Sequence, residues 1–251
     1  ATNSICRGLI TDLNGNVVQR PFAKFWTFKQ YIAQDLLLLS EGQTKVVDAP
    51  VRAIHEKVDG TVGVLYWADD VPYIATQRSF TNAKALKGTQ ILHARYAHLF
   101  GRFDRSLTYV FEIIYKETAI LVDYDMDEEL VLISMIETAS GRSLPLESCT
   151  LGLRTAHDLT ARYRAYANDL GKLESLDLPN AEGFVITYED ESRVKVKFPT
   201  FRKAHAAFAR LLACRRSLAL AERAVFPEGV RSHYHGTEVR AWTEQEYQEV
   251  M

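Results

Sequence analysis

A strict alternation of apolar and basic residues runs from Arg193 to Phe198. The stretch reads Arg-Val-Lys-Val-Lys-Phe, so that Arg193, Lys195 and Lys197 alternate with apolar residues. Successive side chains of a β-strand point to opposite faces. The pattern therefore predicts a strand with one buried apolar face and one cationic face.

Other apolar or alternating runs, separated by turn residues, predict the remaining elements. Strands are expected at residues 4–13, 16–19, 51–54, 62–67, 73–80, 107–115, 119–124, 129–136 and 182–188. Helices are expected at residues 29–40, 82–100, 155–172 and 200–225. Many irregularly spaced strands with hairpin turns, interrupted by helices, indicate an α+β fold with mainly antiparallel sheets.

Lys57 lies between two of these apolar runs and is followed by the turn signal Asp59-Gly60, which predicts a hairpin. A lysine at a strand end beside a tight turn can present its amine to a pocket. An ordinary lysine has a pKa near ~10.4 and is a poor nucleophile at neutral pH. Burial beside other cations lowers that pKa and makes the amine reactive. The alternative is a solvated lysine on a hairpin, because such short patterns are common by chance.

Glu112 is the second candidate, because it lies within the apolar strand predicted at residues 107–115. Val110 and Ile114 are its neighbours on the same face. A carboxylate there costs several kcal/mol unless it meets a cation, a metal or hydrogen-bond donors. A structural salt bridge or a position at the sheet edge is the alternative.

The distribution of charge along the chain is compatible with a polyanionic ligand. The net charge is −2, but residues 193–216 contain eight Lys or Arg residues and no acid. Such a stripe permits binding of a polyanion, and a solvated helix face is an equal alternative. Three widely separated cysteines favour free thiols in a reducing compartment, which we take to be the cytoplasm. We expect neither a signal peptide nor a membrane span.

Six short motifs occur in order along the chain: Arg7-Gly8, Arg20-Pro-x-x-Lys24-Phe, Lys57-x-Asp-Gly, Phe111-Glu112, Glu182-Gly-Phe-Val and Lys195-x-Lys197. Their order and spacing resemble the covalent nucleotidyltransferase superfamily of polynucleotide ligases and capping enzymes. Over residues 5–198 the chain looks most like the RNA ligase 1 branch. The resemblance implies an antiparallel-sheet, ATP-grasp-like ligase domain.

The resemblance also implies a reaction. Such enzymes use ATP and Mg²⁺ or Mn²⁺ to form a lysyl-AMP, pass the AMP to an RNA 5′-phosphate, and join that end to a 3′-hydroxyl. By this resemblance Lys57 is the nucleophile, and Lys195 and Lys197 contact the α-phosphate and depress the pKa of Lys57. Glu182 binds the metal, and Glu112 holds the ribose or a metal-bound water.

The remaining expected site residues fall into three groups. Arg7 and Lys24 would grip the β- and γ-phosphates. Nucleotide contacts are also expected from Glu56, Asp59, Gly60, Arg78, Tyr124 and Val185. RNA contacts are expected from Arg202, Lys203, Arg210, Arg215 and Arg216.

Residues 1–199 are expected to form the adenylyltransferase domain, and residues 200–251 a helical C-terminal extension. Because the last part looks helical rather than like a β-barrel, a DNA ligase or a capping guanylyltransferase is a weaker alternative. A nucleotide-binding module that has lost catalysis is another. We expect a monomer or one excised domain of a larger RNA repair protein, with tRNA as a possible substrate.

Overall fold

The computed structural model describes residues 6–31, 49–116, 120–125, 128–167 and 169–225. The chain divides into two compact units, residues 1–201 and 202–251. Helix α5, Pro199–Val225, supplies the described part of the second unit. Among the described residues, no helix is both long and apolar enough to cross a bilayer.

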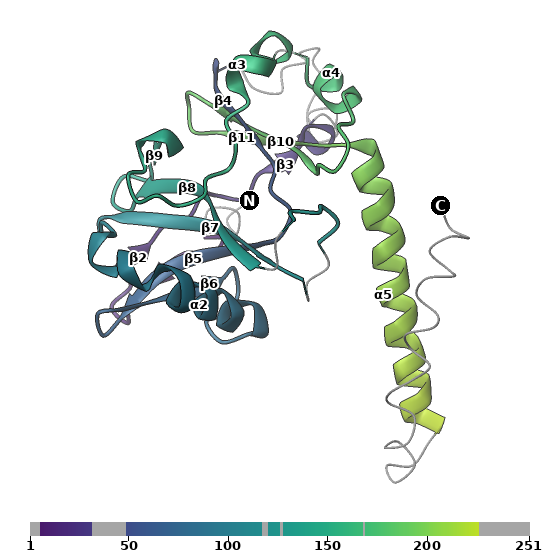
Figure 1. Ribbon diagram of the computed structural model, residues 1–251, viewed down its shortest axis with the longest axis horizontal. Coiled ribbons are helices and arrows are strands. Elements are labelled where there is room, and N and C mark those ends of the chain that lie inside the picture. The colour runs from purple at the N-terminus through teal and green to yellow at the C-terminus, as the bar shows by residue number, and fades with distance from the viewer. Residues whose placement is uncertain (1–5, 32–48, 117–119, 126–127, 168, 226–251) are drawn as a thin grey trace. The chain divides into compact units, whose positions relative to one another are not determined.

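A five-stranded antiparallel sheet forms the larger part of the first unit (Figure 1). Its strand order is β6 (Val71–Thr76), β5 (Thr61–Ala68), β7 (Leu107–Tyr115), β8 (Glu128–Glu137) and β9 (Ser143–Leu144). The central strand β7 is buried along nearly its whole length. Both faces of a central strand can be covered, and its sequence is then continuously apolar rather than alternating.

A four-stranded sheet is the second layer of this unit. Its order is β3 (Trp26–Thr27), β11 (Arg193–Lys197), β10 (Gly183–Tyr188) and β4 (Val51–Glu56). All of its pairings are antiparallel except the parallel pair β3–β11. A separate hairpin joins β1 (Ile10–Thr11) to β2 (Val17–Gln19).

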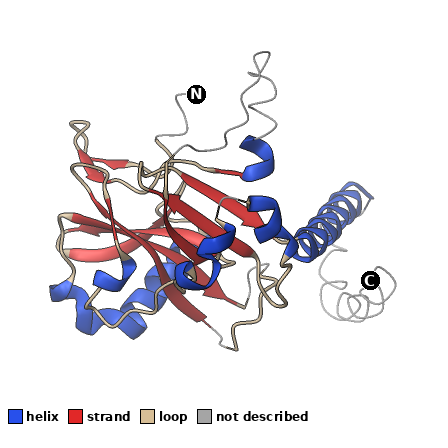
Figure 2. Ribbon diagram, turned by 90° about the horizontal axis from the view of Figure 1, so that it is seen from above, coloured by secondary structure: helices blue, strands red, loops and turns tan. Residues whose placement is uncertain are grey.

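Helical segments cover the outer surfaces of the sheets (Figure 2). Helix α2 (Ala83–Tyr96) packs on the five-stranded sheet and continues as the 3₁₀ helix η2 (Ala97–Arg102). The short elements are η3 (Leu146–Ser148), α3 (Thr160–Tyr163), η4 (Arg164–Tyr166) and α4 (Leu170–Ser175). Each sheet has its own hydrophobic core, and the alternation in β11 buries Val194 and Val196 completely in one of them.

The predicted α+β fold with antiparallel sheets is confirmed. The predicted elements at residues 82–100, 107–115, 129–136, 182–188, 193–198 and 200–225 are present. The first predicted strand is much shorter than expected, because only Ile10–Thr11 pairs with the return strand. Most of the helix predicted at 29–40 lies outside the described residues.

The strand predicted at residues 119–124 is wrong. Its described part, from Ile120 onward, is a loop without strand pairing. The backbone N–H groups of Leu121 and Val122 instead donate to the carboxylate of Asp59, at 2.7 and 3.3 Å. A side-chain acceptor therefore takes the donors that a neighbouring strand would otherwise have bonded.

The single helix predicted at residues 155–172 is also wrong. Only the short segments α3, η4 and α4 are helical there. Before them, the chain runs extended between the two sheets. The Leu132 N–H donates to the backbone carbonyl of Arg154 at 2.8 Å, and the Leu159 N–H donates to the backbone carbonyl of Ile54 at 2.8 Å. Pairing with both sheets outweighs local helix propensity.

Candidate active site

The segment from Lys57 to Gly60 crosses from one sheet to the other. Strand β4 before it pairs with β10, whereas β5 after it pairs with β6 and β7. The predicted Lys57 hairpin is therefore wrong. Gly60 is required for close approach, since a Cβ atom there would lie 2.6 Å from the carbonyl oxygen of Ile113. This crossing places Lys57 where the two sheets face each other.

Cross-strand pairing aligns the cationic residues on one face of the four-stranded sheet. The Lys57 N–H donates to the carbonyl of Gly183 at 2.8 Å, and Gly183 is opposite Lys197. In the next row His55, Val185 and Lys195 are side by side. Alternation along strands thus brings Lys57 together with Lys195 and Lys197, which are 138 and 140 residues later in the chain.

Glu182 lies between two of these lysines. Its Oε2 is 2.8 Å from the Lys57 Nζ, and its Oε1 is 2.7 Å from the Lys197 Nζ. The Glu182 side chain is 3% exposed, whereas those of Lys57 and Lys197 are 19% and 25% exposed. The next residue must be glycine for β10 to lie this close to β11, because a Cβ atom on Gly183 would lie 1.9 Å from the Val196 carbonyl oxygen.

The expectation that Lys195 and Lys197 depress the pKa of Lys57 is wrong for this arrangement. Burial acts to lower that pKa, but attraction to Glu182 and Glu112 outweighs it, and the pKa of Lys57 is raised. Lys195, by contrast, has a depressed pKa. Burial and then repulsion from Lys57 and Lys197 lower the pKa of Lys195 to about 8.

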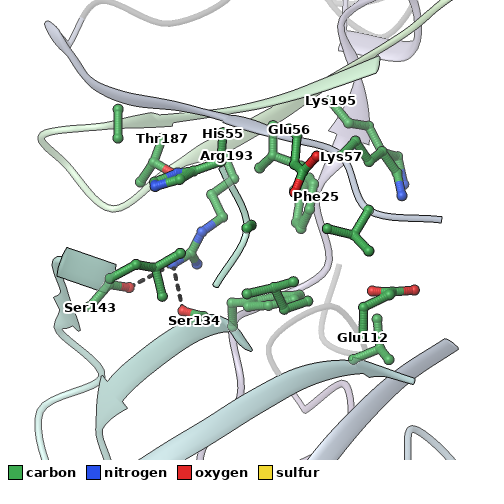
Figure 3. A pocket seen from close by; sticks show the side chains of 18 of the residues that line it. Phe25, His55, Glu56, Lys57, Glu112, Ser134, Ser143, Thr187, Arg193 and Lys195 are labelled. Carbon is green, nitrogen blue, oxygen red and sulfur yellow. Dashed lines mark hydrogen bonds between the residues drawn. The ribbon is translucent and has the colours of Figure 1, made fainter. Parts of the chain in front are cut away.

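Glu112 faces this cluster from β7 of the five-stranded sheet (Figure 3). The side chain is 6% exposed, and none of the hydrogen bonds or ion pairs within the described residues involves it. Burial raises the pKa of Glu112 to about 8, although Lys57 acts in the opposite direction. The site thus contains one carboxylate that is paired with lysines and one that is not.

A pocket between the two sheets contains much of this constellation (Figure 3). Of the residues expected to bind nucleotide or catalyse transfer, Arg7, Glu56, Lys57, Glu112, Val185 and Lys195 line it. Glu56 also contacts His157, whose Nδ1 is 3.3 Å from the carboxylate. Apolar residues of both sheets, including Ile133 and Leu144, complete the walls.

The described residues contain no group of three or more His, Cys, Asp or Glu side chains able to hold a metal by themselves. Glu182 and Glu112 nevertheless suit Mg²⁺ or Mn²⁺ as donors, because hard cations prefer carboxylate oxygens and keep several waters or phosphate oxygens as ligands. The buried Glu112 carboxylate, with no protein partner among the described residues, fits such a role.

A family model described as RNA ligase matches residues 5–201 of this sequence. The chain belongs to the RNA ligase family. A curated protein from Thermovibrio ammonificans, described as "Putative RNA ligase", is 27% identical over 205 residues. That similarity covers 78% of this chain and 51% of the relative, so the chain spans about half the length of that relative.

Solved RNA ligases have the same fold. A Naegleria gruberi RNA ligase variant in its apo form has a TM-score of 0.54 and 13% identity, and a variant with ATP and Mn has a TM-score of 0.53 and 13% identity. Each match covers 74% of this chain and 58% of the other. An archaeal ATP-dependent RNA ligase has a TM-score of 0.51 and 15% identity, covering 77% and 52% of the two chains.

Several residues that were predicted to contact the nucleotide do not line the pocket. The Lys24 Nζ lies 3.5 Å from the centre of the Trp26 ring, and Arg78 is exposed in the turn after β6. The Tyr124 hydroxyl accepts a hydrogen bond from the Asp59 N–H at 2.5 Å. Asp59 is itself buried against the loop at Leu121, and burial raises its pKa. Nucleotide contacts by these residues remain predictions.

The basic residues expected to bind RNA lie on α5 of the second unit. Lys203 and Arg210 are exposed on that helix, and Arg202 is partly buried. Arg215 and Arg216 are within the helix, but their side chains lie outside the described set. RNA binding by all five remains a prediction.

The pocket-lining residues that were not predicted include His55, Ser134, Ser143 and Arg193. For Arg193 the signal was present, since it lies on the cationic face of the same alternating strand as Lys195. His55 is two residues before Lys57 and so is on the same face of its strand. For Ser134 and Ser143 we find no signal in the sequence that distinguishes them from other serines.

Proposed function

We propose that this chain is an ATP-dependent RNA ligase that joins 5′-phosphate and 3′-hydroxyl RNA ends through a lysyl-AMP and an RNA-adenylate. The observation that carries the proposal is the position of Lys57. Its amine lies on a pocket wall beside Lys195 and Lys197, with Glu182 in direct contact and Glu112 facing it from the other sheet. Membership of the RNA ligase family supports the choice of RNA and ATP.

In the first step the neutral Lys57 Nζ attacks the α-phosphorus of ATP. A P–N bond forms and the nitrogen releases one proton, while the bond from the α-phosphorus to the leaving oxygen breaks and pyrophosphate departs. Lys195 and Lys197 flank the attacking amine and are positioned to stabilise the charge on the phosphoryl oxygens. Arg7, on the same pocket, can orient the leaving phosphates.

In the second step an oxygen of the RNA 5′-phosphate attacks the lysyl-AMP. The P–N bond breaks, and the Lys57 nitrogen leaves as an amine and regains its proton. In the third step the RNA 3′-hydroxyl attacks the 5′-phosphorus of the RNA-adenylate, its proton is lost and AMP departs. Lys57 therefore returns to the state in which it began.

Lys57 must lose a proton before it can attack, and Glu182 holds that proton in place. A divalent cation bound at Glu182 and Glu112 would neutralise the two carboxylates that raise the pKa of Lys57 and would polarise the α-phosphate. Glu182 thus has two roles in the proposal. It pairs with Lys57 and Lys197, and it supplies an oxygen ligand of the type that Mg²⁺ and Mn²⁺ prefer.

The proposed substrate is RNA, with a cleaved tRNA as the proposed example, and the chain acts as a monomer or as one domain of a longer RNA repair protein. Its free thiols, Cys6, Cys149 and Cys214, suit the cytoplasm of a cell or of a phage-infected host. Basic side chains of α5 would add contacts to RNA phosphates.

The primary test is incubation with α-labelled ATP and Mg²⁺, followed by a denaturing gel and peptide mapping. The expected result is an acid-labile, base-stable AMP adduct on Lys57 that is absent from Lys57→Ala. Lys172→Ala is the matched control, because Lys172 is exposed on α4 and pairs with Asp169, and neither residue lines the pocket. GTP run in parallel tests the capping alternative, and 5′-phosphorylated DNA tests the DNA ligase alternative.

Absence of an adduct in the parent protein, with ATP still bound, would overturn the proposal in favour of an inactive nucleotide-binding module. Sealing is measured separately by circularisation of a 5′-phosphorylated RNA. Charge reversal at Lys203 and Arg210 should weaken RNA binding and reduce its salt dependence. An unchanged salt slope would remove α5 from the proposed RNA contacts.

A further inference from the structure

The guanidinium group of Arg193 lies in the same pocket as Lys57 but farther along the four-stranded sheet. Arg193 lies two residues before Lys195 on the same face of β11, which is about 7 Å along a strand. In the sheet Arg193 is opposite Thr187, in the row beyond His55, Val185 and Lys195. The pocket therefore continues from Lys57 toward Arg193 (Figure 3).

The Arg193 side chain spans the space between the two sheets. Its Nη2 donates to the Ser143 Oγ at 2.6 Å and lies 3.4 Å from the Ser134 Oγ. Its guanidinium carbon lies 5.0 Å from the centre of the Phe22 ring. These contacts hold the planar group in one orientation at the end of the pocket.

No carboxylate among the described residues forms an ion pair with Arg193. The nearby acid, Glu191, is already bound by both terminal nitrogens of Arg52, at 2.5 and 3.0 Å. Guanidinium has five N–H donors, and the two serines use at most two of them. A partly buried guanidinium that faces a pocket with unused donors is suited to a ligand that brings acceptors.

Apolar residues on opposite sheets line the pocket near Arg193, together with the polar residues Thr187 and Arg52. Val185 lines one side, and Ile133 and Leu144 line the other. A pocket with apolar walls and a few fixed polar groups is the usual form of a site for a small-molecule ligand, which includes a purine base. His55 lies between Arg193 and Lys57, and because burial lowers the pKa of His55 its imidazole is neutral and can also accept a hydrogen bond.

We propose that Arg193, held by Ser143 and Ser134, recognises the purine base of ATP by donating a hydrogen bond to one of its ring nitrogens. This inference rests on the proposed function, because it takes Lys57 as the point of attachment of the nucleotide. Lys57 and Lys195 then meet the α-phosphate, the ribose spans the next row of the sheet, and the base lies between Val185 and Ile133.

The test measures Lys57 adenylylation as a function of nucleotide concentration for ATP and its 1-deaza, 3-deaza and 7-deaza analogues. Each analogue replaces one ring nitrogen by CH. For the parent protein, one analogue should have a KM roughly tenfold to a hundredfold above that of ATP, the effect expected for a hydrogen bond to a charged group. Arg193→Gln should raise the KM for ATP by a similar factor.

Two features separate base recognition from a purely structural role. In Arg193→Gln the preference for ATP over that analogue should fall to near one, because each change removes the same hydrogen bond. The kcat should stay within about threefold, because Arg193 does not contact the α-phosphate. Arg142→Gln is the matched control, since Arg142 is an exposed neighbour of Ser143 bound to Glu137.

An unchanged preference in Arg193→Gln would overturn the inference, as would a fall in kcat at unchanged KM. If Arg193→Gln does not fold, Ser143→Ala provides the same test, with a smaller loss of preference expected, and unchanged preference there would equally overturn it. The two failures are distinguishable. No adduct with any nucleotide refutes the proposed function, whereas an adduct with unaltered base preference refutes only the role of Arg193.

Discussion

The two sheets of the first unit contribute different groups to the pocket. The five-stranded sheet is most deeply buried at its strands β7 and β8 and supplies mainly apolar walls, with Glu112 as its charged member. The four-stranded sheet buries one face and places Lys57, Lys195 and Arg193 on the other. One sheet thus supplies mainly apolar wall, and the other carries the cations that we propose contact the nucleotide.

The difference follows from the surroundings of each strand. Strand β7 is central, and a charge within it is desolvated, as the raised pKa of Glu112 shows. Strand β11 has one apolar face in a core and one facing the pocket, where Lys195 and Lys197 are partly exposed. Charge is therefore concentrated where solvent or ligand can reach it.

Removing the charge of Glu182, which contacts Lys57 and Lys197, should have the largest effect on activity. We expect Glu182→Gln to lower the rate of Lys57 adenylylation at least about a hundredfold, because metal and lysine orientation together supply several kcal/mol. The control is Glu128→Gln on the five-stranded sheet, where Glu128 pairs with Lys87 at 2.5 Å. A gain in rate for Glu182→Gln would instead mean that Glu182 only restrains the lysine proton.

A glycine from each sheet tests how tightly the site is built. Gly183→Ala should reduce the free energy of unfolding by at least about 3 kcal/mol, because the new Cβ meets the Val196 backbone and the residue has a φ of 147°. Gly63→Ala on the five-stranded sheet should cost about 1–3 kcal/mol, because its Cβ meets the Ile74 side chain at 2.7 Å.

Urea denaturation measures both glycine variants. Gly101→Ala is their control and should be nearly neutral, since no atom lies within 4 Å of its new Cβ. If Gly183→Ala and Gly63→Ala lose the same unfolding free energy, the backbone of the four-stranded sheet is not the more tightly constrained of the two.

Glu112→Gln should show the cost of charge in the five-stranded sheet. The pKa of Glu112 is about 8 in the folded protein and 4.5 without the fold. Between these values the folded state binds more protons, so the parent loses stability as pH rises. Relative to the parent, the variant should gain about 2–4 kcal/mol in unfolding free energy between pH 4.5 and pH 8.

Unfolding in urea at several pH values measures this difference for Glu112→Gln. Glu128→Gln is again the control, because its carboxylate is at the strand end and is about one-third exposed. A difference between Glu112→Gln and the parent that did not vary with pH would show that the Glu112 carboxylate is already ionised in the folded protein.

The smallest expected effect concerns the pH dependence set by Lys195. Because the pKa of Lys57 is raised, its neutral fraction grows with pH across the accessible range. Lys195, with a pKa of about 8, loses its charge above that pH. The kcat/KM for adenylylation, which reports the free enzyme, should therefore rise with pH and level off near pH 8.

Lys195→Arg keeps the charge, and its kcat/KM should continue to rise above pH 8. Relative to the parent, its gain between pH 7 and pH 9 should be about tenfold. Lys172→Arg on the exposed surface is the control. A parent profile that rises without levelling would mean that the charge of Lys195 is not needed in this step.

Local sequence patterns predicted the parts of this protein that depend on near neighbours. The alternation from Arg193 to Phe198, the apolar run around Glu112 and the helix at 200–225 were all read correctly, because strand and helix periods act over a few residues. The order of the short motifs around Lys57 also indicated the RNA ligase family, which the match over residues 5–201 confirms.

Only the tertiary structure decided how these parts meet. It showed that Lys57 lies on a crossing between sheets instead of a hairpin, and that Glu182 raises its pKa where neighbouring lysines were expected to lower it. It also brought Arg193 to Ser134 and Ser143 across the pocket. Electrostatic energies depend on distances of a few ångströms between remote segments, and no local pattern contains those distances.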